Sequence, residues 1–381
     1  MSANPNSPLK SLASFDKDLA EVSIRGQWQY DEMLERLIGG PRSTAVPMMW
    51  RWDIVQRKLM EACEVMAESF TARRNLSFIN PGLERGGTTQ TILAGMQAVK
   101  PGEVAWAHRH PISALRFVMD GDPKLFTVVD GEILTMETND LVLTPAWSWH
   151  DHHNESDMLG VWLDVLDVPL MLSLGQMAYQ PLGETTQPIR AERHEYLSER
   201  TGVVRPLWEQ KVGGAMPRRY PWKEVKRQLD LFCEGGPASP YDDVILEYVD
   251  PTTGGATLPT LRCCVQRLRP GFVGRPHRRT ASTVYYVVDG EGSTRIGDTE
   301  LHWGPRDVFV VPTWAWHEHR CGAGGAAATL FSVSDAPLLE AAQLYREEPE
   351  SQVRRRSAPP PPLESRVAPD AVPSTTTKEA R

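Results

Sequence analysis

Five of the ten histidines in this 381-residue chain lie in two short clusters, with a spacing that suits a metal site. His108 and His110 are two residues apart, which places both imidazoles on one face of an extended strand. His150 follows after another strand-like run, and His152 lies two residues beyond it. Three neutral imidazole nitrogens suit Fe, Zn, Cu or Ni and leave positions open for other ligands. We therefore predict a metal held by His108, His110 and His150, rather than three structural core histidines.

Two further side chains near these histidines could act on a bound anion. Arg116 has the parity of His108 and His110, so an unbroken strand would place it on their face. A carboxylate in an apolar pocket needs such a cation, whereas a surface arginine would only be solvated. If His152 is not a ligand, its imidazole can hydrogen-bond a substrate hydroxyl or bound oxygen near neutral pH. The alternative for His152 is a turn histidine that faces solvent.

The elements that must position these residues are mostly short β-rich runs. Residues 1–70 contain an amphipathic helical pattern over 52–63 and are otherwise irregular. From about residue 73, and again from about 243, apolar runs alternate with Gly, Pro, Asn and Asp turns, which is typical of an all-β sandwich or barrel. Between these two regions, residues 222–235 predict a helix. The last 30 or so residues are rich in proline and charge, and they predict a disordered tail.

The two β-rich regions repeat each other. The segment PGEVAWAHRH from Pro101 aligns with PGFVGRPHRR from Pro270, and DLVLTPAWSWHDH from Asp140 aligns with DVFVVPTWAWHEH from Asp307. Matched motifs in the same order make a duplicated domain a better explanation than chance similarity. The sequence thus predicts these divisions: an N-terminal segment 1–70, a first metal-binding barrel 71–175, a linker with a helix 176–240, a second barrel 241–345 and a disordered tail 346–381.

Charge and hydropathy exclude several classes of protein. The chain has 41 Lys and Arg against 49 Asp and Glu, a formal net charge of −8. This balance argues against a nucleic-acid-binding protein, which would show a basic patch. The most apolar stretch, residues 160–177, contains two aspartates and a proline and does not predict a membrane span. The five cysteines form no disulfide framework, and the N-terminal residues show no secretion signal, so we expect a cytoplasmic protein.

Longer motifs resemble one enzyme family. The chain looks like a bicupin, and more narrowly it resembles the gentisate 1,2-dioxygenase family, which includes salicylate and 1-hydroxy-2-naphthoate dioxygenases. The resemblance runs from about residue 45 to 345 and is carried by residues 46–53, 72–83, 95–117, 143–154 and 310–319. It implies an all-β-dominated fold of two tandem jelly-roll-like cupin barrels with N-terminal and linker helices. The general cupin motif adds a glutamate after the H-x-H pair, but PISALRF after His110 has no carboxylate, which matches the three-histidine site of this family.

The resemblance also implies a reaction and a set of site residues. The reaction is O2-dependent cleavage of a hydroxylated aromatic carboxylate at one Fe(II) per chain, between the carbons that bear the carboxyl and hydroxyl groups. Gentisate is the first expected substrate; salicylate, a substituted salicylate and 1-hydroxy-2-naphthoate are the alternatives. The implied catalytic residues are His152 and Arg116, and the implied substrate-binding residues are Arg73 (or its neighbour Arg74), Arg116, Gln97, Gly95 and His152. Leu93 stands where family members often carry an aromatic residue, which leaves the substrate open.

The second copy departs from the metal pattern, because it reads His277-Arg278-Arg279. Arg279 stands at the position of the second ligand, so we expect no catalytic metal there. The family resemblance implies a homotetramer, and the N-terminal segment carries three tryptophans that suit packing between subunits. The hypothesis of another class is a non-catalytic storage or ligand-binding bicupin.

Overall fold

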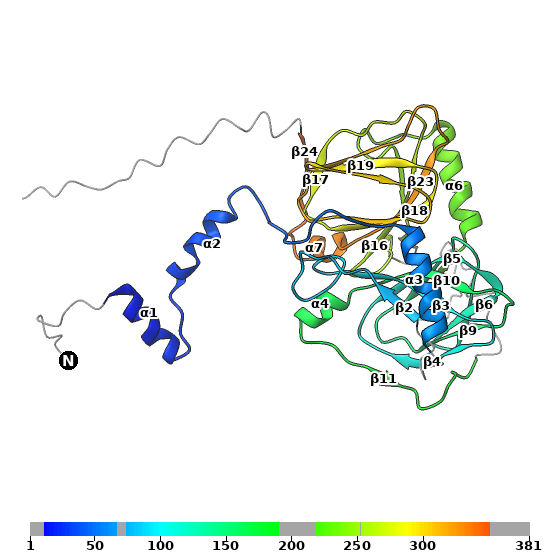
Figure 1. Ribbon diagram of the computed structural model, residues 1–381, viewed down its shortest axis with the longest axis horizontal. Coiled ribbons are helices and arrows are strands. Elements are labelled where there is room, and N and C mark those ends of the chain that lie inside the picture. The colour runs from blue at the N-terminus through cyan, green and yellow to red at the C-terminus, as the bar shows by residue number, and fades with distance from the viewer. Residues whose placement is uncertain (1–10, 67–73, 190–217, 252, 351–381) are drawn as a thin grey trace, which may run out of the picture.

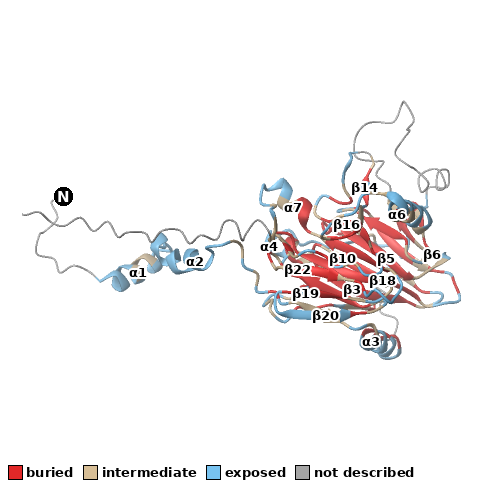
Figure 2. Ribbon diagram, turned by 90° about the horizontal axis from the view of Figure 1, so that it is seen from above, coloured by how far each residue is buried: buried red, intermediate tan, exposed pale blue. Residues whose placement is uncertain are grey.

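The computed structural model describes residues 11–66, 74–189, 218–251 and 253–350 of the chain. It contains two β barrels that lie one above the other in Figure 1, with few helices around them. Every strand pair in both barrels is antiparallel. Figure 2 shows that the strands hold most of the buried residues and that the helices lie at the periphery. The two-barrel, all-β-dominated fold predicted from the repeat is confirmed.

The first barrel consists of two facing sheets. The six-stranded sheet has the order β12-β8-β5-β10-β3-β2, and its strands are β2 (Arg74–Ser77), β3 (Leu93–Val99), β5 (Ala114–Asp120), β8 (Leu141–Thr144), β10 (Gly160–Leu166) and β12 (Arg219–Tyr220). The five-stranded sheet has the order β11-β4-β9-β6-β7, and its strands are β4 (Val104–Arg109), β6 (Asp122–Val129), β7 (Glu132–Met136), β9 (His150–Asn154) and β11 (Gln180–Pro181). Apolar side chains such as Val118, Leu125 and Trp162 fill the space between the sheets.

The second barrel repeats this plan. Its six-stranded sheet has the order β1-β21-β18-β23-β16-β13, and its strands are β1 (Met48–Trp50), β13 (Val244–Glu247), β16 (Arg262–Leu268), β18 (Thr283–Asp289), β21 (Val308–Val311) and β23 (Ala328–Ser334). Its five-stranded sheet has the order β20-β19-β22-β17-β24, and its strands are β17 (His277–Arg279), β19 (Gly292–Ile296), β20 (Thr299–Trp303), β22 (His317–Arg320) and β24 (Glu347–Pro349). A short ribbon pairs β14 (Val249–Asp250) with β15 (Gly255–Ala256).

The two six-stranded sheets pack against each other and form the contact between the barrels. Phe117 of β5 stacks on Phe331 of β23 with 4.2 Å between ring centroids, and both rings belong to one continuous buried cluster. Because side chains alternate along a strand, residues on either side of Phe117 point into the first barrel instead. A sheet that is covered on both faces needs apolar residues at both odd and even positions of its strands. This explains the nearly continuous apolar runs in these strands.

The segments that precede each barrel contribute to the other barrel. Strand β1 pairs with β21 of the second barrel, whereas β12 pairs with β8 of the first. Helix α3 (Trp52–Val65) follows β1, and helix α6 (Trp222–Gly235) follows β12. Both helices were expected from the sequence, and both are confirmed.

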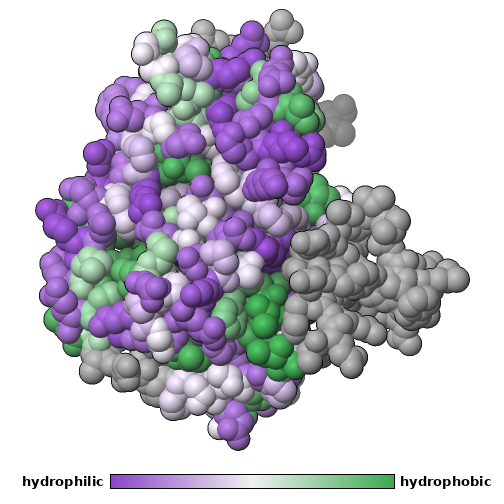
Figure 3. Space-filling view, turned by 90° about the vertical axis from the view of Figure 1, so that its right-hand side faces the viewer, coloured by the Kyte–Doolittle hydropathy of each residue, from purple (hydrophilic) through white to green (hydrophobic). Residues whose placement is uncertain are grey.

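The remaining helices are short and lie at the edges. Helices α1 (Leu12–Glu21), η1 (Gln27–Tyr30) and α2 (Asp31–Arg36) form an arm that extends away from the barrels (Figures 1 and 2), while α4 (Val168–Ser173) and α7 (Ala336–Ala341) each follow the last long strand of a barrel. Among the described residues, no helix has the length and hydropathy needed to span a membrane. On the face shown in Figure 3, polar residues dominate the upper, second barrel, and apolar residues gather in small groups mainly on the lower half.

One predicted boundary is wrong at its start. Residues 346–350 were expected to belong to a disordered tail, but β24 pairs with β17 along Glu347–Pro349. Two of its glutamates also form ion pairs with β17, namely Glu347 with Arg279 and Glu348 with Arg278. The composition of the segment does not predict this strand. The backbone and the glutamates of β24 are paired with β17, which lies far away in the sequence. The rest of the predicted tail, 351–381, lies outside the described residues.

Candidate metal centre and active site

Three buried histidines meet inside the first barrel. His108 lies on β4, His110 follows that strand directly, and His150 begins β9. Strands β4 and β9 are neighbours, and His108 is paired with His150 in their register. One nitrogen from each imidazole lies within 4.8 Å of the others, so together they form a group that fits one metal ion. The H-x-H spacing and the later histidine thus converge as the sequence predicts.

Each of these imidazoles is oriented by a backbone carbonyl. Nδ1 of His108 donates to Trp106 O at 2.8 Å, Nδ1 of His110 to Ile112 O at 3.0 Å, and Nδ1 of His150 to Ser148 O at 3.0 Å. A carbonyl only accepts, so Nδ1 carries the proton and Nε2 keeps its lone pair. Such partners fix the tautomer and the ring orientation of metal-binding histidines.

The surroundings of His150 also favour its uncharged form. Burial, the neighbouring His108 and the Arg116 guanidinium lower the pKa of His150 well below its usual value. A neutral imidazole is the form that binds a metal ion, so His150 is in the form that a metal site requires.

A cavity of about 210 Å³ lies beside the three histidines. Arg116 of β5 enters it from the opposite sheet, is almost fully buried, and donates from Nη1 to Thr144 Oγ1. Arg116 therefore lies beside the histidines as predicted, but not because they share one unbroken strand. His108 and Arg116 belong to opposite sheets and both line the cavity between them.

The sequence did not predict Asp164, which faces Arg116, or Asn75, which binds Asp164. Asp164 of β10 is directly opposite Arg116 in the register, with Oδ1 3.9 Å from Arg116 Nε. Asn75 of β2 donates from Nδ2 to the other carboxylate oxygen of Asp164 at 3.1 Å. The available signal was the carboxylate of Asp164 in an otherwise apolar strand, at a position whose side chain points into the barrel. From the sequence, this residue served only as evidence against a membrane span over 160–177.

Gly95 explains how Asn75 reaches Asp164. In β3, Gly95 lies between Asp164 on one neighbouring strand and Ser77 on the other. A Cβ atom at Gly95 would lie 2.6 Å from Asn75 Oδ1, so any side chain there would displace the Asn75 amide. The space left by Gly95 is thus occupied by Asn75, and an effect of Gly95 on a substrate would be indirect.

Of the other residues predicted to bind the substrate, two line the cavity and one does not. His152 of β9 and Gln97 of β3 both line the cavity and are buried. Within the described part of the chain, Gln97 Nε2 makes no hydrogen bond, so it is available to a ligand. Arg73 lies outside the described residues. Its neighbour Arg74 does not line the cavity, because both of its terminal nitrogens bind the Glu103 carboxylate at 2.6 and 2.7 Å.

The cavity wall away from the metal ligands is partly apolar. Leu93, Leu166 and Val168 form this part of the wall, and Asn75 and Ser77 form a polar edge beside it. The site therefore offers three imidazoles at one side, a buried guanidinium at another and a mixed surface for the body of a small ligand.

Comparisons with known proteins agree with this arrangement. The cupin-domain profile matches residues 95–166 and again residues 264–334. A 1-hydroxy-2-naphthoate 1,2-dioxygenase from Nocardioides sp. (strain KP7) is 46% identical over 358 residues, covering 93% of this chain and 92% of the relative. A 5-aminosalicylate 1,2-dioxygenase from Comamonas sp. is 38% identical, covering 90% of this chain and 92% of the relative.

A solved structure supports the same relationship. The salicylate 1,2-dioxygenase from Pseudoaminobacter salicylatoxidans, in a crystal structure with gentisate, superposes with a TM-score of 0.79 at 32% identity. The match covers 92% of this chain and 98% of that one.

Proposed function

Because this chain belongs to the two-barrel cupin family of gentisate, salicylate and 1-hydroxy-2-naphthoate 1,2-dioxygenases, we propose that its first barrel carries out the family's ring opening with Fe(II). The protein is a ring-cleaving dioxygenase for a hydroxylated aromatic carboxylate. The observation that carries the location of the site is one buried cavity lined by the three-histidine group, a guanidinium and a fourth imidazole. The alternative of a non-catalytic storage or ligand-binding bicupin is wrong, because the relatives that match most of the chain are dioxygenases.

His108, His110 and His150 would hold the iron through Nε2. The donor set fits, because three neutral imidazoles with their Nδ1 protons engaged present three nitrogens and leave other positions open. Bound there, Fe(II) would supply a chelation point for the carboxylate and ortho-hydroxyl oxygens of the substrate and the redox chemistry for O2. One Fe(II) per chain is expected, since among the described residues only this group has the required geometry.

Arg116 would bind the substrate carboxylate. Its guanidinium is buried and aimed at the cavity, and Asp164 and Thr144 fix its orientation before the ligand arrives. Charge-assisted hydrogen bonds from a preorganised guanidinium hold a carboxylate in a defined plane, which positions the ring for cleavage. Gln97 Nε2 would add a neutral donor on the same side.

His152 would exchange a proton with the substrate. It lies two residues beyond His150 on β9, and the rings of the two residues are 5.8 Å apart. The proposed role is to take a proton from the substrate hydroxyl during binding and to return one during ring opening, which is general acid–base work suited to imidazole.

The substrate proposed for the first assay is 1-hydroxy-2-naphthoate. The relative named for that acid is more similar to this chain than the 5-aminosalicylate and gentisate enzymes, at 46% identity against 38% and 35%. Leu93, Leu166 and Val168 would give a second aromatic ring an apolar wall. Gentisate and salicylate, which share the carboxylate and ortho-hydroxyl group, are the alternatives.

The test is O2 uptake by the Fe(II)-loaded protein with each of these acids, together with metal analysis. Turnover of at least one acid with one iron per chain is expected, and His108→Ala should lose both the iron and the activity. No turnover of any of them, or full iron content in His108→Ala, would contradict the proposal.

We also propose that the protein is a homotetramer. None of the helices α1, η1 and α2 has a buried residue, yet they expose large apolar side chains that include Phe15, Trp28 and Leu34. Several exposed large apolar side chains on one segment are typical of an interface. Light scattering should report about four times the 42.6 kDa chain mass, and removal of residues 1–38 should lower it. A full-length 42.6 kDa particle at micromolar concentration would refute the assembly.

A further inference from the structure

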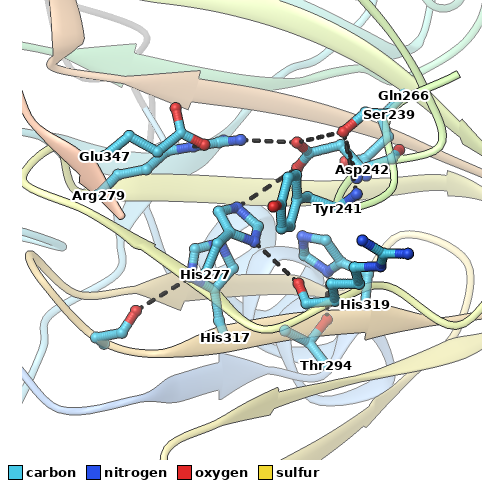
Figure 4. A network of polar contacts seen from close by, with 12 residues as sticks. Ser239, Tyr241, Asp242, Gln266, His277, Arg279, Thr294, His317, His319 and Glu347 are labelled. Carbon is cyan, nitrogen blue, oxygen red and sulfur yellow. Dashed lines mark hydrogen bonds and ion pairs between the residues drawn. The ribbon is translucent and has the colours of Figure 1, made fainter. Parts of the chain in front are cut away.

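The second barrel contains a buried polar cluster at the place that corresponds to the three-histidine group (Figure 4). His277 of β17 and His317 of β22 are paired in the register, as His108 and His150 are in the first barrel. Their ring centroids are 4.2 Å apart, against 4.1 Å for His108 and His150. Two of the three ligand positions have therefore kept their geometry.

The orientation of these two rings is preserved as well. Nδ1 of His277 donates to Arg275 O at 3.3 Å, and Nδ1 of His317 donates to Ala315 O at 3.1 Å. In each case the carbonyl lies two residues earlier in the chain, as it does for His108 and His150. Nε2 of both rings is therefore the unprotonated nitrogen, which is the form that binds a metal.

Arg279 occupies the position that corresponds to His110 in the first barrel. It lies two residues after His277, just as His110 follows His108. Its Nη2 donates to Asp242 Oδ2 at 2.7 Å and its Nε to Glu347 Oε1 at 3.1 Å. Asp242 itself is almost fully buried, so its charge depends on this partner.

The cluster also holds polar atoms that nothing in the described chain satisfies. Asp242 Oδ1 lies 3.9 Å from His277 Nε2, and neither atom makes a hydrogen bond within the described residues. Buried polar atoms are satisfied in most proteins, so such a pair requires an explanation. A carboxylate oxygen and an imidazole nitrogen that face each other beside a cation are what a metal site leaves when its ion is replaced.

We propose that the second barrel keeps the frame of a metal centre and that the Arg279 guanidinium, paired with Asp242, supplies the positive charge that an ion would supply. Arg279→His should then be enough to create a divalent-metal site from the introduced imidazole, His277, His317 and Asp242. The native second barrel binds no metal, because the guanidinium already fills the position. This inference concerns the second barrel alone and holds whether or not the first barrel acts as proposed above.

Metal titration of the metal-free protein tests the proposal. With Co²⁺ or Zn²⁺, Arg279→His should bind one more ion per chain than the parent. Adding His277→Ala to that variant should return the count to the parent value. The matched control is Arg278→His, which introduces an imidazole one residue away, where Arg278 binds Glu348 and stacks on Trp314 rather than entering the cluster. This control should bind the same number of ions per chain as the parent.

Thermal unfolding covers the case in which a variant folds poorly. Arg279→Met leaves the Asp242 charge buried without its partner and should lower Tm, and adding Asp242→Asn should recover most of the loss. Zn²⁺ should raise the Tm of Arg279→His more than that of Arg279→Met. The proposal is overturned if Arg279→His binds no more ions per chain than the parent, if Zn²⁺ does not stabilise it, or if Asp242→Asn gives no recovery.

Discussion

Replacing Arg116 with Met should abolish most turnover and leave the iron in place. A guanidinium and a carboxylate form two charge-assisted hydrogen bonds, each worth about 1.5–3 kcal/mol when buried. Losing both removes about 3 kcal/mol or more, which corresponds to about 150-fold or more in kcat/KM. Arg116 is not a member of the three-histidine group, so the metal content should not change.

The same change also leaves Asp164 inside the barrel without the cation that faces it at 3.9 Å. Removing one partner of a buried pair destabilises a protein by about 3–5 kcal/mol, so lower activity alone could reflect a damaged fold. The double variant Arg116→Met/Asp164→Asn separates the two effects, because it removes the stranded charge without restoring a carboxylate-binding group. We expect it to regain stability and to remain inactive.

Arg219→Met is the matched control. Arg219 forms a largely buried ion pair with Asp140 on the same barrel, but it lines no part of the cavity. It should lower Tm and keep kcat/KM within about threefold of the parent. The assay is steady-state O2 uptake over a range of substrate concentrations, with iron measured in the same samples. A kcat/KM near the parent value in Arg116→Met, or full recovery of activity in the double variant, would refute the assignment.

Three further predictions test other parts of the molecule. His152→Gln should keep the iron and lower kcat by about 100-fold, as loss of a general acid–base does, and unchanged turnover by O2 uptake would move the proton transfer to another group. Ending the chain after Glu350 should leave Tm unchanged, whereas ending it after Leu344 removes β24 and its ion pairs to β17 and should lower Tm by about 3 °C or more; equal melting curves would contradict this. Burial alone would raise the pKa of Glu103, but the Arg74 hydrogen bonds lower it below 4.5, so its stabilising contribution is present above that pH and is lost as the pH falls through the lowered value. Urea unfolding of Glu103→Gln should therefore lose less stability than the parent between about pH 6 and about pH 3, and parallel losses would count against the pair.

The three-histidine group could be predicted because its geometry is mostly local. Two histidines that are two residues apart in an extended segment share a face whatever the rest of the fold does, and the third recurs at a matched point of the repeat. The repeat itself also predicted two barrels, since each copy is long enough to close its own pair of sheets. These inferences needed only strand alternation and the order of motifs.

The support of Arg116 could not be predicted in the same way. Asn75 and Asp164 are 89 residues apart and lie on opposite sides of β3, so their contact depends on strand order and register. It also depends on Gly95, whose missing side chain opens the path between them. A sequence shows that a glycine leaves space, but only the neighbouring strands decide which side chain fills that space.

The exchange of edge strands makes each barrel depend on the segment that precedes the other. Asp307 of the second barrel accepts a hydrogen bond from Trp52 N at the start of α3, and Asp140 of the first accepts one from Trp222 N at the start of α6, each at 2.8 Å. Each helix follows a strand that completes the other barrel's six-stranded sheet. An edge strand removed from either sheet would expose unpaired backbone groups and the apolar face beneath.

A second pair of contacts ties the barrels together with the same reciprocity. Asp167 of the first barrel accepts from Thr260 Oγ1 at 2.7 Å, and Asp335 of the second accepts from Thr91 Oγ1 at 2.5 Å. Both carboxyl groups are buried, and this burial raises their pKa. The sheet that carries Arg116 and Asp164 is thus buried on its outer face by the second barrel and extended at its edge by β12. The second barrel therefore supports the sheet that lines the cavity, through the buried contact between the six-stranded sheets and through this pair of hydrogen bonds.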